Sequence, residues 1–417
     1  MNNDDPFFYR VPEDWDVTKV GAYCQKPEYG FTESAIADEI GPKFLRITDI
    51  TENGVNWDTV PYCRCPQDIF PKYELKENDI LFARIGATTG KSYIAKNPPQ
   101  AVFASYLIRL RPLNDLVPDF LYYFFNSDGY WDQVNANKNN NLKGGVNSST
   151  LADIRFPLPP KKEQQKIAAV LYKIQKAIEI QESIIEKTRE LKKSTLHYVF
   201  THGLLGEKLK ETEIGPIPES WDLGTIEDLC LLRNESCNPI TCDSRVYVGL
   251  EHIESGKFLL RSHGSPKEVR STKNKFNQYD ILYGKLRPYL DKVVVAEVDG
   301  ICSTDIIVLK LKGNTDAFFL IGLLHSDRFI QYANQTTRGV NHPRTSWTSL
   351  KDFTAPIPNS KEQKEVAHVF QTIEKKIENH TAKKTALQDL FKTMLNKLMT
   401  GEIRVKDLDI DISGVSA

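Results

Sequence analysis

FPLPPKKEQQKIAAVLYKIQKAIEI (residues 156–180) and APIPNSKEQKEVAHVFQTIEKKIEN (residues 355–379) are two copies of one segment in a chain of 417 residues. Eleven positions are identical at an offset of 199 residues, and the register needs no gap as far as Thr201 and Thr400. A repeat of this length indicates a duplication. It predicts two globular units, each followed by a long helix.

Both repeat segments are expected to be helical. Pro157 and Pro159 cannot lie inside a helix, so they form an extended lead-in. The helices are predicted from about Lys161 to about Phe200 and from about Ser360 to about Met399. Steps of three and four between apolar residues form the narrow stripe of a coiled coil. The stripe consists of Ile167, Leu171, Ile174, Ile178, Ile185 and Leu191 in the first helix, and of Val366, Phe370, Ile373, Ile377, Leu387, Met394 and Leu398 in the second.

Each stripe needs a partner, and the other helix of the chain is the simplest one. An antiparallel pair roughly 60 Å long, at 1.5 Å per residue, would place the globular units at opposite ends with approximate two-fold symmetry. The alternative is two separate helices, each packed on its own unit, although a globular surface usually takes a wider stripe.

The duplication extends into the globular parts. VPEDWD (11–16) returns as IPESWD (217–222), and NDILFAR (78–84) returns as YDILYGK (279–285). GVN at 145–147 is echoed by GVN at 339–341, which gives the second copy five extra residues before its helix. We therefore expect two globular domains of one fold at 1–155 and 206–354. Helical segments follow them at 156–205 and, with the C-terminal tail, at 355–417.

Each globular domain is predicted to be α+β with a mixed or antiparallel sheet. Short apolar runs bounded by turn residues indicate strands, and a more helical stretch follows them. The predicted strands of the first domain include 44–47, 80–83, 92–95 and 101–110. The helical stretches are 119–134 and its counterpart 316–332.

The composition is that of a soluble globular protein, with 40% hydrophobic and 26% charged residues. No apolar run reaches the ~18–20 residues that span a bilayer, and the N-terminus, MNNDDPFFYR, has no apolar signal core. Seven cysteines at irregular positions argue against a disulfide framework and for a reducing cytoplasm.

The net charge of −1 gives no general basic surplus for nucleic acid. Residues 80–114, however, contain no Asp or Glu and carry Arg84, Lys91, Lys96, Arg109 and Arg111. A local basic patch can bind phosphate even in a neutral chain. Ordinary solvated loops are the other interpretation.

The chain resembles the specificity subunits of type I restriction–modification systems. The resemblance rests on the helix starts at Leu158 to Gln164 and Ile357 to Gln363, on GKLRPYLDKV (284–293) and on CSTDIIVL (302–309). It covers essentially the whole chain. It implies a subunit without catalysis of its own, in which two target recognition domains are joined by conserved helical spacers.

The resemblance also implies partners. They are double-stranded DNA carrying a bipartite, asymmetric site, two adenine methyltransferase subunits, and restriction subunits recruited through the methyltransferases. Two recognition domains held apart by a helical rod would contact separated half-sites. The length of the rod would set their separation, as the spacing of the two subunits does in dimeric DNA-binding proteins.

Loops at matching strand ends are the first candidates for DNA contact. Arginine pairs bidentately with guanine, lysine pairs with phosphate, and small residues let the backbone approach a phosphate. In the second domain Pro288 could instead stiffen a structural turn on which Tyr289 packs. The candidates are Lys285, Arg287, Tyr289 and Lys292 in the second domain, and Arg84, Thr88 and Lys91 in the loop 84–91 of the first.

A second candidate loop precedes each long helix. KNNNLKGGVNSST (138–150) has no acidic residue, and TTRGVNHPRTSW (336–347) is its counterpart. Asparagine suits adenine and arginine suits guanine in the major groove, although loops of this composition are also plain connectors. The candidates are Lys138, Lys143 and Asn147 in the first domain, and Arg338, Asn341 and Arg344 in the second.

The sequence offers no catalytic or metal-binding constellation and calls for no cofactor. The histidines are scattered, and Cys63, Cys65, Cys237 and Cys242 lack zinc-site spacing. Asn97-Pro98-Pro99 is followed by Gln100 rather than by the aromatic residue of an adenine methyltransferase motif. The hypothesis from a different class is a non-catalytic coiled-coil scaffold whose two globular ends bind proteins.

Overall fold

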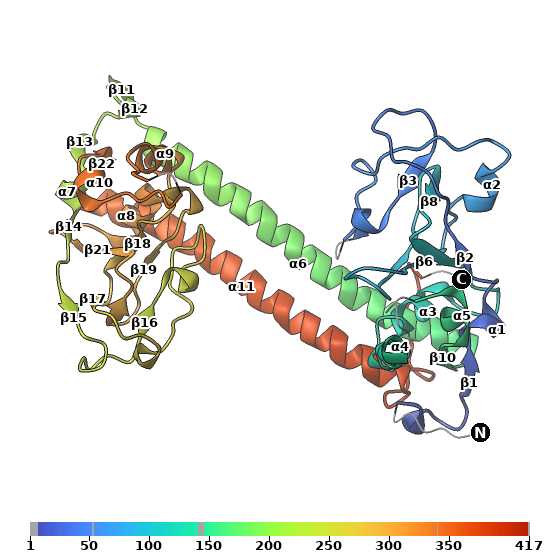
Figure 1. Ribbon diagram of the computed structural model, residues 1–417. Coiled ribbons are helices and arrows are strands. Elements are labelled where there is room, and N and C mark those ends of the chain that lie inside the picture. Colours follow the sequence, from blue (N-terminus) through green and yellow to red (C-terminus); the bar gives the residue numbers. More distant parts are fainter. Residues whose placement is uncertain (1–6, 52–53, 141–145, 340, 416–417) are drawn as a thin grey trace. The chain divides into compact units, whose positions relative to one another are not determined.

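A similar order of strands and helices occurs twice along the chain (Figure 1). The computed structural model describes residues 7–51, 54–140, 146–339 and 341–415. Contacts divide the chain into unit 1, Met1–Ile180 with Lys384–Ala417, and unit 2, Gln181–Lys383. Each unit thus combines a globular part with parts of both long helices, whereas the sequence analysis treated the helices as separate segments.

Unit 1 is built on an antiparallel sheet of order β2-β9-β6-β7. Smaller pairs accompany it: β1 with β10, β4 with β5, and the parallel pair β3 with β8. The strands are β1 (Asp16–Lys19), β2 (Glu28–Tyr29), β3 (Lys43–Leu45), β4 (Ile50–Thr51), β5 (Gly54–Val55), β6 (Ile80–Ala83), β7 (Ser92–Ile94), β8 (Ala101–Phe103), β9 (Leu107–Leu110) and β10 (Arg155–Leu158). The helices are α1 (Val20–Tyr23), α2 (Phe70–Tyr73), α3 (Pro118–Phe124), α4 (Asp128–Asn140), α5 (Ser148–Asp153) and the start of α6 (Lys161–His202).

Unit 2 repeats this plan with a sheet of order β14-β21-β18-β19. A second sheet has the order β15-β17-β20-β16, in which β16 and β20 are parallel. The strands are β11 (Leu209–Thr212), β12 (Gly215–Pro218), β13 (Asp222–Thr225), β14 (Cys230–Leu232), β15 (Ser236–Cys237), β16 (Tyr247–Val248), β17 (Lys273–Phe276), β18 (Ile281–Gly284), β19 (Val293–Val295), β20 (Gly300–Cys302), β21 (Ile306–Leu311) and β22 (Thr354–Ile357). The helices are α7 (Ile226–Leu229), α8 (Ala317–Leu324), α9 (Asp327–Gln335), α10 (Trp347–Leu350) and α11 (Ser360–Met399).

The predicted α+β class with mixed strand pairing is confirmed, with two differences in detail. The expected strand 101–110 is two strands, because a turn in which Leu107 N donates to Ala104 O separates β8 from β9. Each expected helical stretch is two helices, split at Ser127 and at Ser326. Both serine hydroxyls donate to a carbonyl of the preceding helix, Ser127 at 2.7 Å and Ser326 at 2.6 Å, and so mark its end.

The paired motifs form a joint between each globular part and its long helix. In unit 1 the buried Trp15 Nε1 donates to Glu163 at 3.1 Å, and in unit 2 Trp221 Nε1 donates to Glu362 at 3.2 Å. The next glutamine accepts a backbone N–H at the start of a helix: Val117 N, at the N-cap of α3, donates to Gln164 at 2.9 Å. Asp316 N donates to Gln363 in the same way at 3.1 Å. Burial requires these polar groups to be paired, which explains why the Trp and Glu-Gln motifs occur in both copies.

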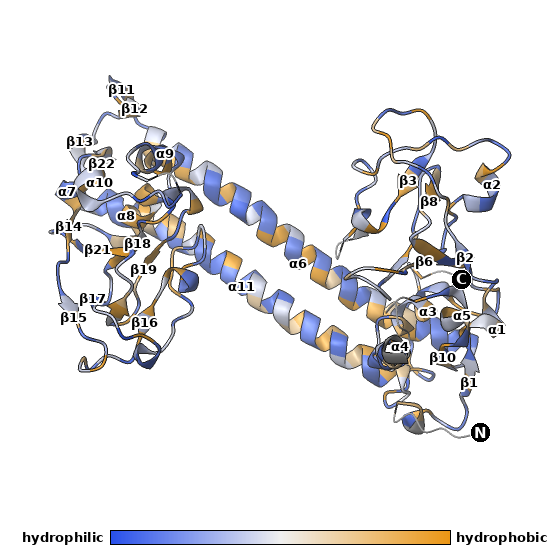
Figure 2. Cartoon of the chain, in the orientation of Figure 1, coloured by the Kyte–Doolittle hydropathy of each residue, from blue (hydrophilic) through white to orange (hydrophobic). Residues whose placement is uncertain are grey.

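The two long helices pack on each other within each unit, and both are largely hydrophilic with recurring hydrophobic residues (Figure 2). In unit 1, Ile167 and Leu171 share a core with Leu395 and Leu398. In unit 2, Ile185 packs with Ile373 and Ile377. The predicted helix 360–399 agrees with α11, and α6 extends to His202.

One predicted stripe residue is wrong. Leu191 is 51% exposed, and its neighbour Lys192 is buried instead. The Lys192 ammonium forms an ion pair with the buried Glu374 of α11 and donates to Gly256 O at 2.7 Å. It also lies 3.6 Å from the centre of the Phe258 ring. A buried ion pair therefore takes a place in the helix contact that the apolar pattern assigned to leucine.

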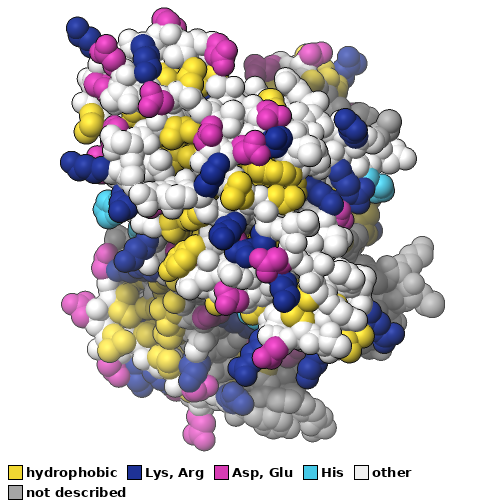
Figure 3. Space-filling model, turned by 90° about the vertical axis from the view of Figure 1, so that its left-hand side faces the viewer, with side chains coloured by type: hydrophobic (Ala, Val, Ile, Leu, Met, Phe, Trp, Pro, Cys, Tyr) yellow, Lys and Arg dark blue, Asp and Glu magenta, His cyan; other side chains and the backbone are white. Residues whose placement is uncertain are grey.

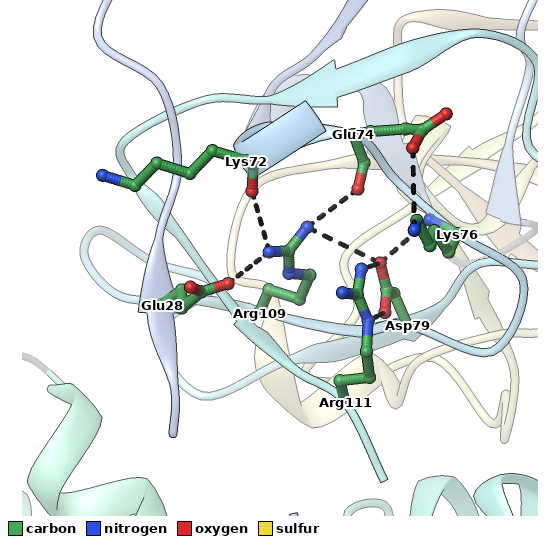
Figure 4. Close-up of polar contacts among 7 residues, drawn as sticks. All are labelled: Glu28, Lys72, Glu74, Lys76, Asp79, Arg109 and Arg111. Carbon is green, nitrogen blue, oxygen red and sulfur yellow. Dashed lines mark hydrogen bonds and ion pairs between the residues drawn. The ribbon is translucent and has the colours of Figure 1, made fainter. Parts of the chain in front are cut away.

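Arg109, which the sequence analysis placed in a basic patch, is instead a buried structural residue (Figure 4). Its guanidinium donates to Glu74 O at 2.8 Å and to Lys72 O at 3.0 Å, and it forms an ion pair with Glu28. These contacts tie β9 to β2 and to the end of α2.

Arg111 is likewise paired, through two hydrogen bonds of 2.7 and 2.8 Å to the fully buried Asp79. Lys96 pairs with Asp119 at 2.9 Å. Three of the five basic residues in the acid-free stretch 80–114 are thus paired with acids from elsewhere in unit 1. In unit 2 the matching aspartate, Asp280, is bound by a different arginine: Arg233 donates to it at 2.6 and 3.1 Å.

Candidate nucleic-acid interface

In unit 2 the two candidate loops lie against each other. The first follows β18, and the second precedes α10. Arg287 N donates to Pro343 O at 2.8 Å, and Thr345 N donates to Lys285 O at 3.0 Å. Arg338 and Arg344 exchange backbone hydrogen bonds of 2.9 and 3.0 Å, which closes the second loop. Two segments far apart in the sequence therefore form one surface.

The first loop of unit 2 presents its side chains outward. Arg287 has a left-handed backbone (φ 52°), which is uncommon for a residue other than glycine. The buried Pro288 follows it, and the Tyr289 side chain is 55% exposed. The tyrosine thus does not pack as the alternative interpretation required. Arg287 is exposed too, and within the part of the chain that the structure describes we find no acid paired with its guanidinium.

The other candidates of unit 2 differ in how they are held. Arg338 and Asn341 are exposed. Arg344 and Lys285 both approach Asp305, with Arg344 Nε 3.0 Å and Lys285 Nζ 3.9 Å from its Oδ1. Lys292 points elsewhere, because its Nζ donates to Leu250 O at 2.6 Å. The surface thus comprises five of the six basic or amide candidates, and Lys292 serves as an anchor below it.

Unit 1 brings its candidate loops together in the same way. Val146 N donates to Arg84 O at 3.1 Å. The Arg84 guanidinium lies 4.8 Å from the centre of the Tyr29 ring, and the Tyr29 hydroxyl accepts from Ser148 N at 3.2 Å. Arg84 is therefore held by an aromatic face rather than by a carboxylate.

The remaining candidates of unit 1 have separate places. Lys91 is exposed and Thr88 is half-buried; both belong to a turn in which Lys91 N donates to Thr88 O at 2.9 Å. Asn147 caps α5, since its side-chain oxygen accepts from Thr150 N at 2.8 Å. Lys143 and the side chain of Lys138 lie outside the described residues.

The echo of GVN between the two copies is not a structural equivalence. Val146 and Thr345 make the same backbone hydrogen bond, and Asn147 and Ser346 are the N-cap residues of α5 and α10. Both pairs are 199 residues apart, as are Ser127 and Ser326. The second copy therefore has no five extra residues here, and Asn341 has no counterpart in Asn147.

Each unit adds to its candidate loops one residue that was not identified from the sequence. Lys285 N donates to Asp305 O at 3.0 Å, and Arg84 N donates to Tyr106 O at 3.1 Å. Asp305 and Tyr106 thus occupy the same position, just before β21 and β9. Tyr106 is 57% exposed. Only the antiparallel pairing of Gly284 with Ile306, and of Ala83 with Leu107, brings them beside the candidate loops.

Neither sign of charge dominates the face of unit 2 that is in view. Figure 3 shows one face of the molecule, over the elements of unit 2, where basic side chains are interspersed with acidic and hydrophobic ones. A phosphate would therefore be drawn to particular loops, and not to a continuous basic surface.

All seven cysteines are free thiols, and burial raises the pKa of Cys24, Cys230 and Cys302 to about 12. These thiols are protonated at neutral pH and pack as small apolar residues. Among the described residues, no group of His, Cys, Asp and Glu has the geometry to hold a metal ion. None of the helices among these residues is suited to cross a membrane.

Comparison with known proteins agrees on one family. Residues 12–189 and 218–389 match the family described as "Type I restriction modification DNA specificity domain". The type I restriction enzyme MjaVIII specificity subunit of Methanocaldococcus jannaschii is 26% identical over 439 residues, which cover 96% of this chain and 95% of that protein. The type I restriction enzyme EcoDI specificity subunit of Escherichia coli is 22% identical over 429 residues, which cover 94% of this chain and 90% of that protein.

The fold is found among solved structures as well. The S subunit of a type I restriction–modification system from M. genitalium has a TM-score of 0.56 at 15% identity, and the match covers 96% of this chain and 97% of that one.

Proposed function

The chain belongs to the family of type I restriction–modification DNA specificity subunits, and from this premise we propose that each unit reads one half of a bipartite DNA site. The observation that carries the proposal is the pair of matching loop junctions. Arg84 with Val146, and Lys285 with Thr345, make the same backbone hydrogen bond at the same place in the fold. The side chains displayed around these junctions differ.

Those side chains are of the types that read DNA. In unit 2, Arg287, Arg338 and Arg344 suit guanine, and Asn341 suits adenine. Lys285 beside them suits the phosphate backbone, which positions a reader without specifying sequence. In unit 1, Arg84 and Lys91 act with exposed Tyr106. Two different sets of side chains on one fold read two different half-sites, and the whole site is asymmetric.

The long helices hold the readers at a set separation. The lengths of 42 residues for α6 and 40 for α11 correspond to roughly 60 Å at 1.5 Å per residue. Within unit 2 the helices run in opposite directions, because Gln181 bonds His380 while Lys192, further along α6, pairs with Glu374. A continuous antiparallel coiled coil would extend this packing between the recognition domains at 1–155 and 206–354 and fix the unread spacer.

The helical segments at 156–205 and 355–417 are also the proposed docking sites for the methyltransferase subunits. Because the segment occurs twice with much the same sequence, it offers two similar surfaces to two copies of one partner. Restriction subunits would then join through the methyltransferases, and the specificity subunit itself supplies recognition without catalysis.

The decisive experiment reconstitutes the chain with its methyltransferase subunits and maps methylated adenines by modification-sensitive sequencing. We expect methylation of one split, asymmetric motif, and none without this chain. Failure to methylate any split motif, although the complex assembles, would refute the proposal. The salt dependence of DNA binding distinguishes the proposal from a protein-binding scaffold. Phosphate contacts weaken steeply with added salt, whereas a scaffold that binds only proteins would show no such DNA binding.

Arg287→Ala sharpens this experiment. We expect the variant to lose about 1–3 kcal/mol of discrimination between bases in one half-site, and to read the other half-site unchanged. The exposed Arg270→Ala, outside both loops, is the matched control for loss of one positive charge from unit 2. Equal loss at both half-sites would show that Arg287 acts on folding rather than on reading.

A further inference from the structure

A carboxylate lies in the middle of the basic loops of unit 2. Asp305 Oδ1 is 3.0 Å from Arg344 Nε, and its Oδ2 is 3.5 Å from an Arg344 terminal nitrogen. Lys285 Nζ approaches the same carboxylate at 3.9 Å. An acid at this place opposes the approach of phosphate, so a surface selected only for DNA affinity would not contain it.

The fold does not require this carboxylate. The Asp305 backbone is held independently, because its carbonyl accepts from Lys285 N at 3.0 Å and its N–H donates to Ser303 Oγ at 3.2 Å. In unit 1 the same backbone contact is made by Tyr106, which has no carboxylate. The side chains are also open to solvent: 31% of Asp305 and 45% of Arg344 is exposed, and exposed ion pairs contribute little to stability.

The geometry does serve the orientation of Arg344. Its Nε and one terminal nitrogen face Asp305, which fixes the plane of the guanidinium. A planar fork held along one edge still presents N–H groups along the other. Guanine recognition needs such an edge in a defined plane, because two parallel hydrogen bonds must reach O6 and N7 together.

We propose that Asp305 is a positioning residue that fixes the Arg344 guanidinium to read a guanine in the half-site of unit 2. The inference rests on the proposed function and deepens it. Asp305 lowers the affinity of this surface for DNA of any sequence and raises its discrimination at one base pair. Unit 1 solves the same problem differently, since Arg84 is oriented by the Tyr29 ring.

The test compares Asp305→Asn with the unaltered chain in the reconstituted methyltransferase complex. Two readouts are needed: the methylated motif, and the affinity for non-specific duplex DNA as a function of salt. We expect non-specific binding to tighten several-fold and discrimination at one base pair of one half-site to fall about tenfold, within the range of a single bidentate contact. The other half-site stays unchanged. Asp243→Asn, which removes an exposed acid of unit 2 outside the loops, is the control and leaves the motif as it is.

A double-variant cycle shows whether Asp305 acts through Arg344. In an Arg344→Ala background, Asp305→Asn should change the motif no further. A continued effect there would overturn the inference, because Asp305 would then contact a base itself. An unchanged motif in the single Asp305→Asn variant would overturn it too, as would equal loss at both half-sites. If the unaltered complex reads no split motif, the proposed function fails; if it reads one and only the Asp305 results disagree, this inference fails alone.

Discussion

Replacing Lys192 with methionine tests what the buried ion pair contributes to unit 2. The Lys192 and Glu374 side chains are only 10% and 4% exposed. Methionine matches the length of the lysine stem and leaves the Glu374 carboxylate buried without its counter-charge. Removing one partner of such a pair is expected to destabilise the unit by about 3–5 kcal/mol. The neighbouring exposed residue, Lys193, supplies the control. Lys193→Met removes a weak ion pair with Asp327 at 3.8 Å and should change stability by less than about 0.5 kcal/mol.

The double variant Lys192→Met with Glu374→Leu should recover most of that loss. Burial lowers the pKa of Lys192 although the Glu374 carboxylate opposes this, so desolvation outweighs the attraction of the pair. Apolar replacement of both partners removes both effects. The remaining loss comes from the contact with Phe258, about 0.5–2 kcal/mol, and from the hydrogen bond to Gly256 O.

The assay is hydrogen exchange of unit 2 amides, followed by mass spectrometry, in the full chain. A loss of 3–5 kcal/mol accelerates exchange through unfolding of the unit by roughly two to three and a half powers of ten. Because the folded pKa of Lys192 lies below its unfolded value of 10.5, the unfolded chain binds more protons between the two values. Stability therefore rises with pH as 10.5 is approached, and Lys192→Met lacks this rise. Equal exchange in the single and double variants would refute the reasoning.

Three further outcomes are expected. Arg404→Met removes the guanidinium that donates to Glu163 at 2.8 and 2.9 Å, and should destabilise unit 1 by about 3 kcal/mol in urea unfolding. Desolvation would raise the pKa of Glu163, but hydrogen bonds from Arg404 and Trp15 hold it below 4.5. The difference in stability between the variant and the unaltered chain should therefore shrink as the pH falls below 4.5. Tyr106→Ala should weaken reading of the half-site of unit 1 by about 1–3 kcal/mol if the ring stacks or packs on a base, and methylation mapping that shows an unchanged motif would exclude that role. Removal of one helical turn, about 5.4 Å, from both long helices should shorten the unread spacer by one or two base pairs in the same mapping, and an unchanged spacer would contradict the proposed ruler.

The long helices and several strands of the first domain could be predicted from the sequence because their signals are local. Proline lead-ins and a periodic apolar stripe located α11 at its observed bounds. The error at Leu191 arose at a place where the helix contact depends on a charge. Lys192 can be buried because it pairs with Glu374 of α11, a helix far away in the sequence. The pattern of residues within either helix does not predict that pairing.

The candidate site shows the same division between local and distant signals. The strand ends at Arg84 and Lys285 could be located from the repeat, and both loops do meet a second loop. Asp305 and Tyr106 could not, because they reach the site through antiparallel strand pairing. The GVN triplet misled for a related reason: identical letters stand at positions with different backbone roles, a helix cap in one copy and an exposed turn in the other.

The aspartates buried beneath the sheets limit how chains of this type can recombine. Asp79 is satisfied by Arg111, which follows it in the sequence, whereas Asp280 is satisfied by Arg233, which precedes it. A crossover at this strand that joined the first copy to the second would retain Asp79 but lose both arginines, with the exposed Lys310 in the place of Arg111. A buried carboxylate without its partner is strongly destabilising. Exchanges that keep each aspartate with its own arginine therefore need breakpoints outside residues 79–111 of the first copy and 233–280 of the second.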